Sequence, residues 1–176
     1  MPRSFDVTSE SPAGAAAVWK AFRDKAYWLA RLANYGGDSM TLESLEVGED
    51  GGEDGCEDGT VAVRTTQDLR KGILPGSISR VLPGNTKIVR TERWRPASTN
   101  EFHGEFTMSA HGVPSSGSGT MVLEPAADGS SLRIRGTLEV RIPVMGGRIE
   151  RYIADLIAVE VPQMQQFTAE WIAGEA

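Results

Sequence analysis

Cysteine and histidine are both scarce in this 176-residue sequence, which has one cysteine and two histidines. Cys56 has no second cysteine with which to form an internal disulfide, and this fits a reducing compartment. His103 and His111 are too few for a zinc site, which usually needs three or four converging ligands. We expect both on the polar face of a strand, and we expect no cofactor or metal.

A net positive charge and long apolar runs are also missing. The formal net charge is -6, and both nucleic acid and anionic membranes require a basic surface, so neither is expected as the main partner. No apolar run approaches the length of a membrane span, and the first ten residues lack the apolar core of a signal peptide. These absences predict a cytoplasmic protein without a membrane span.

Recognisable catalytic motifs are absent as well. The sequence has neither a G-x-S-x-G nucleophile elbow nor a glycine-rich phosphate loop in a strand–loop–helix context. Residues 48–60 read GEDGGEDGCEDGT, but they lack the spacing of a calcium-binding loop. Repeated Asp-Gly pairs between two strands favour a solvated hairpin loop instead.

What the sequence does have is enough apolar material for one domain. About 70% of the unfolded surface should be buried at this length, and 40% of the residues are hydrophobic. Nothing indicates an internal repeat or a second domain, so residues 1–176 are predicted to form a single domain. The number of chains in the assembly is left open.

Two short helices are predicted early in the chain. Ser11 as N-cap and Pro12 at the first helical position predict where the first one begins. Asp24 can cap the second, which ends where Gly36 and Gly37 permit a left-handed exit.

The rest of the chain alternates with a period of two, which predicts strands, until a long helix over about 147–173. With the first strand, the predicted strands cover roughly 3–9, 40–47, 60–69, 86–95, 101–111, 119–124 and 131–142. The last strand has one apolar and one polar face, which is typical of an antiparallel sheet with one side against a core. The fold class is therefore α+β, with a sheet packed on the terminal helix.

This element order resembles the START-related superfamily, which has the helix-grip or Bet v 1-like fold. The stretches that carry the resemblance are AYWLARLANYGG, KIVRTERWRP and IERYIADLIAVEVPQMQQFTAEWI. Within that superfamily the chain is similar to an actinobacterial family of unknown function. The resemblance implies a seven-stranded curved antiparallel sheet wrapped around the C-terminal helix, enclosing a cavity for lipids, sterols, polyketides or other apolar molecules.

Glu160 is the least expected residue of the terminal helix. At about 100° per residue it lies in the middle of an apolar stripe. That stripe consists of Ile149, Ile153, Leu156, Met164, Phe167 and Trp171. In one interpretation Glu160 faces an amphipathic cavity, is held by an inward group such as Arg90, and orients the polar end of a ligand. In the other, Pro162 kinks the helix and turns Glu160 to solvent.

The strand KIVRTERW leaves its own inward face ambiguous. Ile88 and Trp94 share a face with Arg90 and Glu92, so if the apolar pair points inward, two charges point inward with it. Buried charges need partners, because an isolated one costs several kcal/mol.

Gly104 and Gly136 leave gaps in the apolar faces of two other strands. They suit either a bent sheet around a void or bulges that serve only curvature. The apolar connection over 71–84 is predicted to be a short helix that plugs one end of the sheet, and the alternative is a mobile lid.

The favoured function is non-catalytic binding or carrying of a small hydrophobic or amphipathic, lipid-like molecule. The predicted ligand contacts are Arg90, Phe102, Phe106, Met108, Leu138, Ile153, Glu160, Met164 and Phe167. The alternative is a polyketide cyclase/aromatase-like or hydrolase-like enzyme that uses the same cavity, with Glu160, Glu92 and Arg90 as acid–base groups. A third possibility is an interaction module whose cavity is filled by its own side chains.

Overall fold

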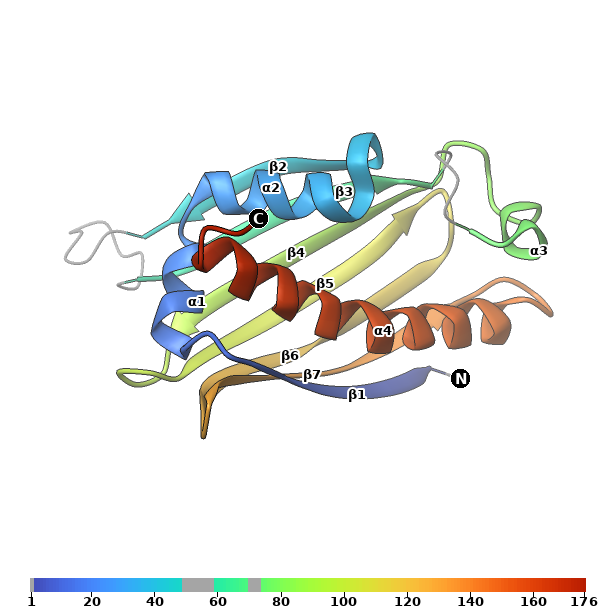
Figure 1. Cartoon of the computed structure of the whole chain (residues 1–176). Coiled ribbons are helices and arrows are strands. Elements are labelled where there is room, and N and C mark those ends of the chain that lie inside the picture. The colour runs from blue at the N-terminus through green and yellow to red at the C-terminus, as the bar shows by residue number, and fades with distance from the viewer. Residues whose placement is uncertain (1, 49–58, 70–73) are drawn as a thin grey trace.

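One seven-stranded sheet curves around the long terminal helix in the computed structural model, which describes residues 2–48, 59–69 and 74–176 (Figure 1). The strands are β1 (Arg3–Ser11), β2 (Met40–Val47), β3 (Val61–Asp68), β4 (Lys87–Pro96), β5 (Phe102–His111), β6 (Ser115–Ala126) and β7 (Gly129–Val140). The helices are α1 (Ala15–Phe22), α2 (Lys25–Gly36), the 3-10 turn η1 (Gly37–Ser39), α3 (Gly76–Ser79) and α4 (Gly146–Ile172).

The sheet order is β1-β7-β6-β5-β4-β3-β2, and every neighbouring pair is antiparallel. The first strand of the chain therefore pairs with the last. Helix α4 packs on β1 and β7, and its later turns meet α1 and α2 (Figure 1). The predicted helix-grip architecture is confirmed.

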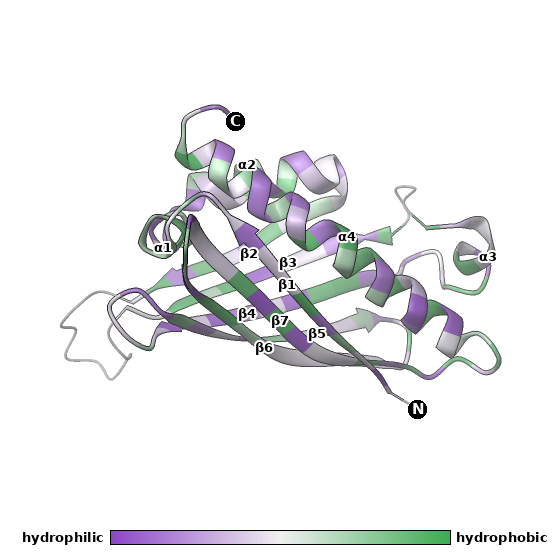
Figure 2. Cartoon of the chain, turned by 60° about the horizontal axis from the view of Figure 1, so that its bottom comes forward, coloured by the Kyte–Doolittle hydropathy of each residue, from purple (hydrophilic) through white to green (hydrophobic). Residues whose placement is uncertain are grey.

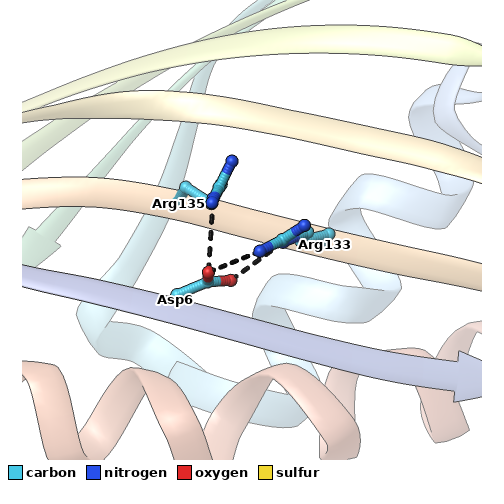
Figure 3. A network of polar contacts seen from close by, with 3 residues as sticks. All are labelled: Asp6, Arg133 and Arg135. Atoms are coloured by element: carbon cyan, nitrogen blue, oxygen red, sulfur yellow. Dashed lines mark hydrogen bonds and ion pairs between the residues drawn. The ribbon is translucent and has the colours of Figure 1, made fainter.

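The pairing of β1 with β7 sets which face of each strand points inward. On the outer face, Arg133 Nε and Nη2 donate to the two carboxylate oxygens of Asp6 at 3.0 and 2.7 Å, and Arg135 Nε donates at 3.2 Å (Figure 3). The hydrogen bond from Arg133 is the largest cause that lowers the pKa of Asp6. With these charges outside, Phe5 and Ile134 lie on the inner face, and hydrophobic and hydrophilic residues alternate along the strands (Figure 2).

The predicted start of the first helix is wrong by three residues. β1 continues to Ser11, which pairs with Ser130 of β7, and α1 begins at Ala15 with Gly14 as its N-cap. The Ser11 hydroxyl accepts from the Ala13 N–H at 3.2 Å, so it stabilises the turn between strand and helix. Strand pairing outweighs the local capping preference here, because it satisfies the backbone of the last residues of β1.

The second helix begins and ends as predicted. The Asp24 carboxylate accepts from the Ala26 N–H at 2.8 Å, which caps α2. The chain leaves α2 at Gly37 with φ of +50°, a conformation that favours glycine.

An aromatic cluster fills the end of the molecule where α1 and α2 cover the sheet. Trp19 stacks on Phe102 with ring centroids 4.6 Å apart, and Phe22 lies 5.1 Å from Trp94. Trp94 sits directly opposite Gly104 in the β4–β5 register, and a Cβ on Gly104 would lie 2.8 Å from its ring. The gap at Gly104 is therefore filled by an indole ring.

Gly136 is filled in the same way. Phe5 and Phe106 meet over it with ring centroids 6.1 Å apart, and a Cβ there would lie 2.8 and 2.9 Å from the two rings. The strand pairs that contain Gly104 and Gly136 have no register shift, so neither residue is a bulge. The bulge interpretation is therefore wrong: each glycine makes room for an aromatic ring within the curved sheet.

Helix α4 is continuous through Pro162, whose ring lies on the exposed side. Near its start, the buried Glu150 accepts from the Val140 N–H at 2.8 Å, which ties the helix to the end of β7. Among the residues that the structure describes, no helix combines the length and apolarity needed to cross a membrane.

Candidate functional site

An apolar chamber of about 170 Å³ lies between the sheet and the first half of α4. We call it the outer chamber. Among the side chains in its wall are Ile88, Met108, Ala110, Leu138, Ile153 and Leu156. A single water needs roughly 10 to 15 Å³ of such space, so the chamber has room for a larger guest. Leu74, Ile78 and Leu82, in and around α3, line one end.

A second, smaller chamber of about 30 Å³ lies deeper, under the aromatic cluster. We call it the inner chamber. Aromatic rings of Phe5, Phe22, Trp94 and Phe106 form much of its wall, and its polar groups come from α2, β4 and α4. Those polar residues are Arg31, Arg90, Glu92, Glu160, Gln165 and Thr168.

The two chambers adjoin at a neck, which we define by the residues that line both. These are Arg90, Met108, Ile157, Glu160 and Met164. The neck is thus where the apolar outer wall gives way to the charged inner one. An apolar lining with a few polar groups at one end suits an amphipathic guest.

Glu92 is the most buried charge of the cluster, with 7% of its side chain exposed. Arg90 Nε lies 2.8 Å from Glu92 Oε1, although its N–H is not aligned for a hydrogen bond, and Trp94 Nε1 donates to Oε2 at 3.1 Å. Burial acts to raise the pKa of Glu92, but the charges of Arg90 and Arg31, together with the hydrogen bond from Trp94, hold that pKa below its usual value. Glu92 is therefore ionised at neutral pH.

Arg31 enters the cluster from α2 with weak partners. Its guanidinium lies 4.8 Å from the centre of the Trp28 ring, and it donates to Tyr27 Oη at 3.4 Å and to Met164 Sδ at 3.0 Å. No carboxylate of residues 2–48, 59–69 or 74–176 lies within ion-pair distance of it. Arg31 is a half-buried cation without an anionic partner in contact.

Glu160 lies at the neck, between the outer chamber and the two arginines. Burial raises its pKa, and the charges of Arg90 and Arg31 act against that shift without cancelling it. The helix is unbroken at Pro162, so Glu160 keeps the inward position that the regular period predicts.

Gln165 is a buried polar residue of the cluster whose amide nitrogen is left without a hydrogen bond. It is 2% exposed, lines the inner chamber, and its Nε2 has no hydrogen-bond partner in the described part of the chain. The neighbouring Thr168 is different, because its hydroxyl donates to the Met164 carbonyl at 2.7 Å and shares a 2.7 Å hydrogen bond with Tyr27. A buried amide donor without a partner marks a place for a polar guest atom.

Most of the predicted ligand contacts lie in the wall of one chamber or both. These are Arg90, Phe106, Met108, Leu138, Ile153, Glu160 and Met164. Phe102 and Phe167 line neither chamber: Phe102 stacks on Trp19, and Phe167 packs near the Tyr27 and Tyr35 rings. That any of the wall residues contacts a ligand stays a prediction.

Among the wall residues that were not predicted from the sequence are Arg31, Ile157 and Gln165. Arg31 was detectable, because it lies on the buried stripe of α2 with Tyr27, Trp28 and Leu32. Like Glu160, Arg31 is a charged residue within an otherwise apolar stripe of a helix.

The ambiguous strand is resolved by the packing of Trp94. It lies in the core, so Arg90 and Glu92 point inward with it.

The two histidines lie toward the outside of β5. His103 is partly exposed, His111 is exposed, and His103 Nε2 lies 2.7 Å from Glu101 Oε1.

Two predicted segments fall partly or wholly outside the described residues. The acidic stretch, with Cys56, lies there except at its ends, and so does the start of the connection over 71–84. The described part of that connection contains the short helix α3, whose Ile78 is buried. That this segment plugs one end of the sheet, rather than moving as a lid, stays a prediction. Within the described ranges no group of three or more metal-binding side chains is gathered.

The fold is shared with solved structures of other proteins. The structure superposes on a START superfamily protein from Mycobacterium smegmatis with a TM-score of 0.50 and 11% identity, covering 97% of this chain and 98% of the other. It superposes on TTHA0849 from Thermus thermophilus with a TM-score of 0.56 and 18% identity, covering 99% of both chains. The chain therefore has the START-like helix-grip fold.

Sequence comparison gives the family within that fold. Residues 6–172 match the family described as "Protein of unknown function (DUF2505)", and the chain belongs to this family. A relative from Mycobacterium bovis, the uncharacterised protein Mb0491c, is 37% identical over 174 residues and 98% of each chain is covered.

Proposed function

We propose that this protein binds and carries a small hydrophobic or amphipathic, lipid-like molecule in the outer chamber, without catalysing a reaction on it. The observation that carries the proposal is the chamber of about 170 Å³ between the sheet and α4, with apolar side chains over most of its wall. The protein would act in the cytoplasm. Proteins with the same fold commonly hold apolar ligands, which supports the proposal by analogy.

Binding free energy would come mainly from the burial of ligand carbon. At about 25 cal/mol per Å², a guest that loses roughly 250 Å² of apolar surface gains on the order of 6 kcal/mol before the cost of immobilisation. The charged neck would contribute direction, because Arg90 and Glu160 lie where the outer chamber adjoins the inner one.

Native mass spectrometry of the purified protein tests the proposal, together with one variant that blocks the chamber. Ala110 of β5 lines the outer chamber, so Ala110→Phe should place a ring inside it and abolish the additional mass of a co-purified small molecule. Thr107→Phe is the matched control, since it puts the same ring on the exposed face of the same strand.

The proposal expects a bound molecule in the wild type and in Thr107→Phe, released unchanged on denaturation. A folded Ala110→Phe variant that retains the same molecule would place it outside the chamber and refute the proposal. A released molecule that the protein has chemically altered would favour the enzymatic alternative.

A further inference from the structure

We propose that the guest is a monocarboxylic acid with an apolar tail, whose carboxylate binds in the inner chamber at Arg31 and Gln165 while the tail occupies the outer chamber. This inference rests on the proposed function and specifies the class of ligand. It depends on three independent properties of the inner chamber: its charge, its free donors and its size.

The charge of the cluster favours an anion. Glu92 is ionised and within 2.8 Å of Arg90, so these two charges compensate each other. Arg31 has only neutral partners in contact. Burial raises the pKa of Glu160, which favours its neutral form. Arg31 is therefore the cation of the cluster that no carboxylate of the described residues contacts.

The free donors favour an acceptor with two oxygens. A guanidinium carries five N–H donors in a planar fork that matches a carboxylate. Within the described residues, the acceptors of Arg31 are a phenol oxygen and a thioether sulfur. Gln165 adds an amide Nε2 without a partner. Both side chains line the same chamber, so a carboxylate there can accept from both. A hydroxyl or carbonyl head would leave the cation unpaired.

The size of the inner chamber limits the head group. About 30 Å³ accommodates one or two atoms of water size, which suits two carboxylate oxygens. A sugar or a phosphodiester is too large for it. The tail then crosses the neck, where Met108 and Met164 line both chambers. Unbranched thioether side chains adapt easily to a flexible chain.

Three probes with the same ten-carbon tail and different heads test the inference: decanoate, decanol and decyltrimethylammonium. Their dissociation constants are measured by titration calorimetry against the wild type, Arg31→Gln and Gln165→Met. Arg151→Gln is the control for net charge, because Arg151 lies on the exposed side of α4 and lines neither chamber. Ala110→Phe tests whether any binding is in the outer chamber.

We expect decanoate to bind at least about tenfold more tightly than decanol, and the cationic probe to bind most weakly. Arg31→Gln should remove the advantage of decanoate and leave decanol binding unchanged, whereas Arg151→Gln should change neither. Arg31→Lys should restore part of the advantage, because lysine keeps the charge and loses the fork. Gln165→Met removes an unpaired donor without breaking an internal hydrogen bond of that donor, so it should weaken decanoate selectively even if Arg31→Gln fails to fold.

Equal affinity for decanoate and decanol would overturn the inference, and so would an advantage of decanoate that survives in Arg31→Gln. In either case, binding that Ala110→Phe abolishes would still support the proposed function. Failure of all three probes to bind a folded wild-type protein would count against both.

Discussion

Replacing Glu92 by glutamine removes the carboxylate that lies 2.8 Å from Arg90 and whose charge also interacts with that of Arg31. The glutamine Oε1 can still accept from Trp94 Nε1, so the substitution tests charge rather than shape. Two opposite charges about 4 Å apart attract by about 4 kcal/mol at an effective dielectric constant near 20. Arg90 keeps 25% of its side chain exposed, and water screens part of that attraction. We therefore expect Glu92→Gln to lower the free energy of unfolding by about 2 to 3 kcal/mol at pH 7.

Urea unfolding followed by tryptophan fluorescence measures this loss, and a fall of roughly 5 to 10 °C in the melting temperature should accompany it. The effect should also depend on pH with a definite sign. Because the pKa of Glu92 is lowered in the folded protein, its stabilisation is present above the unfolded-state pKa and disappears as pH falls through the folded-state pKa. The gap between wild type and Glu92→Gln should therefore close in acid.

A double-mutant cycle with Arg90→Gln isolates the pair. The double variant should be less destabilised than the sum of the single variants, because removing both charges leaves fewer buried charges uncompensated. A Glu92→Gln protein within about 0.5 kcal/mol of wild type at pH 7, with an unchanged urea dependence, would refute the view that the charged cluster is integral to the fold.

Three further substitutions test other parts of the structure. Burial raises the pKa of Glu160 in the folded state, so the contribution of this group to stability is lost as pH rises through that pKa. Glu160→Gln should therefore be as stable as wild type in acid and more stable by less than about 1 kcal/mol at pH 8, as measured by thermal melts. Val144 is 97% exposed with φ of +69°, which strains a β-branched residue, so Val144→Asn should raise the melting temperature by the equivalent of about 0.5 to 1 kcal/mol, and an unchanged or lower value would contradict the strain. Gly136→Ala would bring a methyl group to 2.6 Å from the Ser118 carbonyl oxygen and should cost about 2 to 3 kcal/mol in urea, whereas the control Gly147→Ala, which meets nothing within 4 Å, should be neutral or stabilising.

The architecture was largely predictable because it follows from local periodicity. The two-residue alternation placed β5 and β7 to within about two residues, and the 3.6-residue period placed α4 to within one. β6 begins four residues earlier than predicted, since SSGS carries no apolar alternation and is held in the sheet by its partners on β5 and β7. The prediction that Ser11 is the N-cap of the first helix was wrong for a related reason, because pairing of β1 with β7 overrode the capping preference of that residue.

The candidate site was only partly predictable. The 3.6-residue period of the helix was enough to place Glu160, Met164 and Ile153 on the inner side of α4. Phe102 and Phe167 have the same apolar character, yet neighbouring rings cover them, and a period cannot distinguish a cavity wall from a filled core.

The sequence by itself determined the order of the elements, the inward face of most strands and the presence of a carboxylate within the apolar stripe of the last helix. These depend on side chains a few residues apart, which one backbone geometry relates directly. The tertiary structure alone decided that Arg31, Glu92 and Gln165, from three separate elements, line one small chamber, and that an apolar space remains beside it. The distance between sheet and helix depends on how large side chains from the whole chain interlock, and no local pattern encodes that volume.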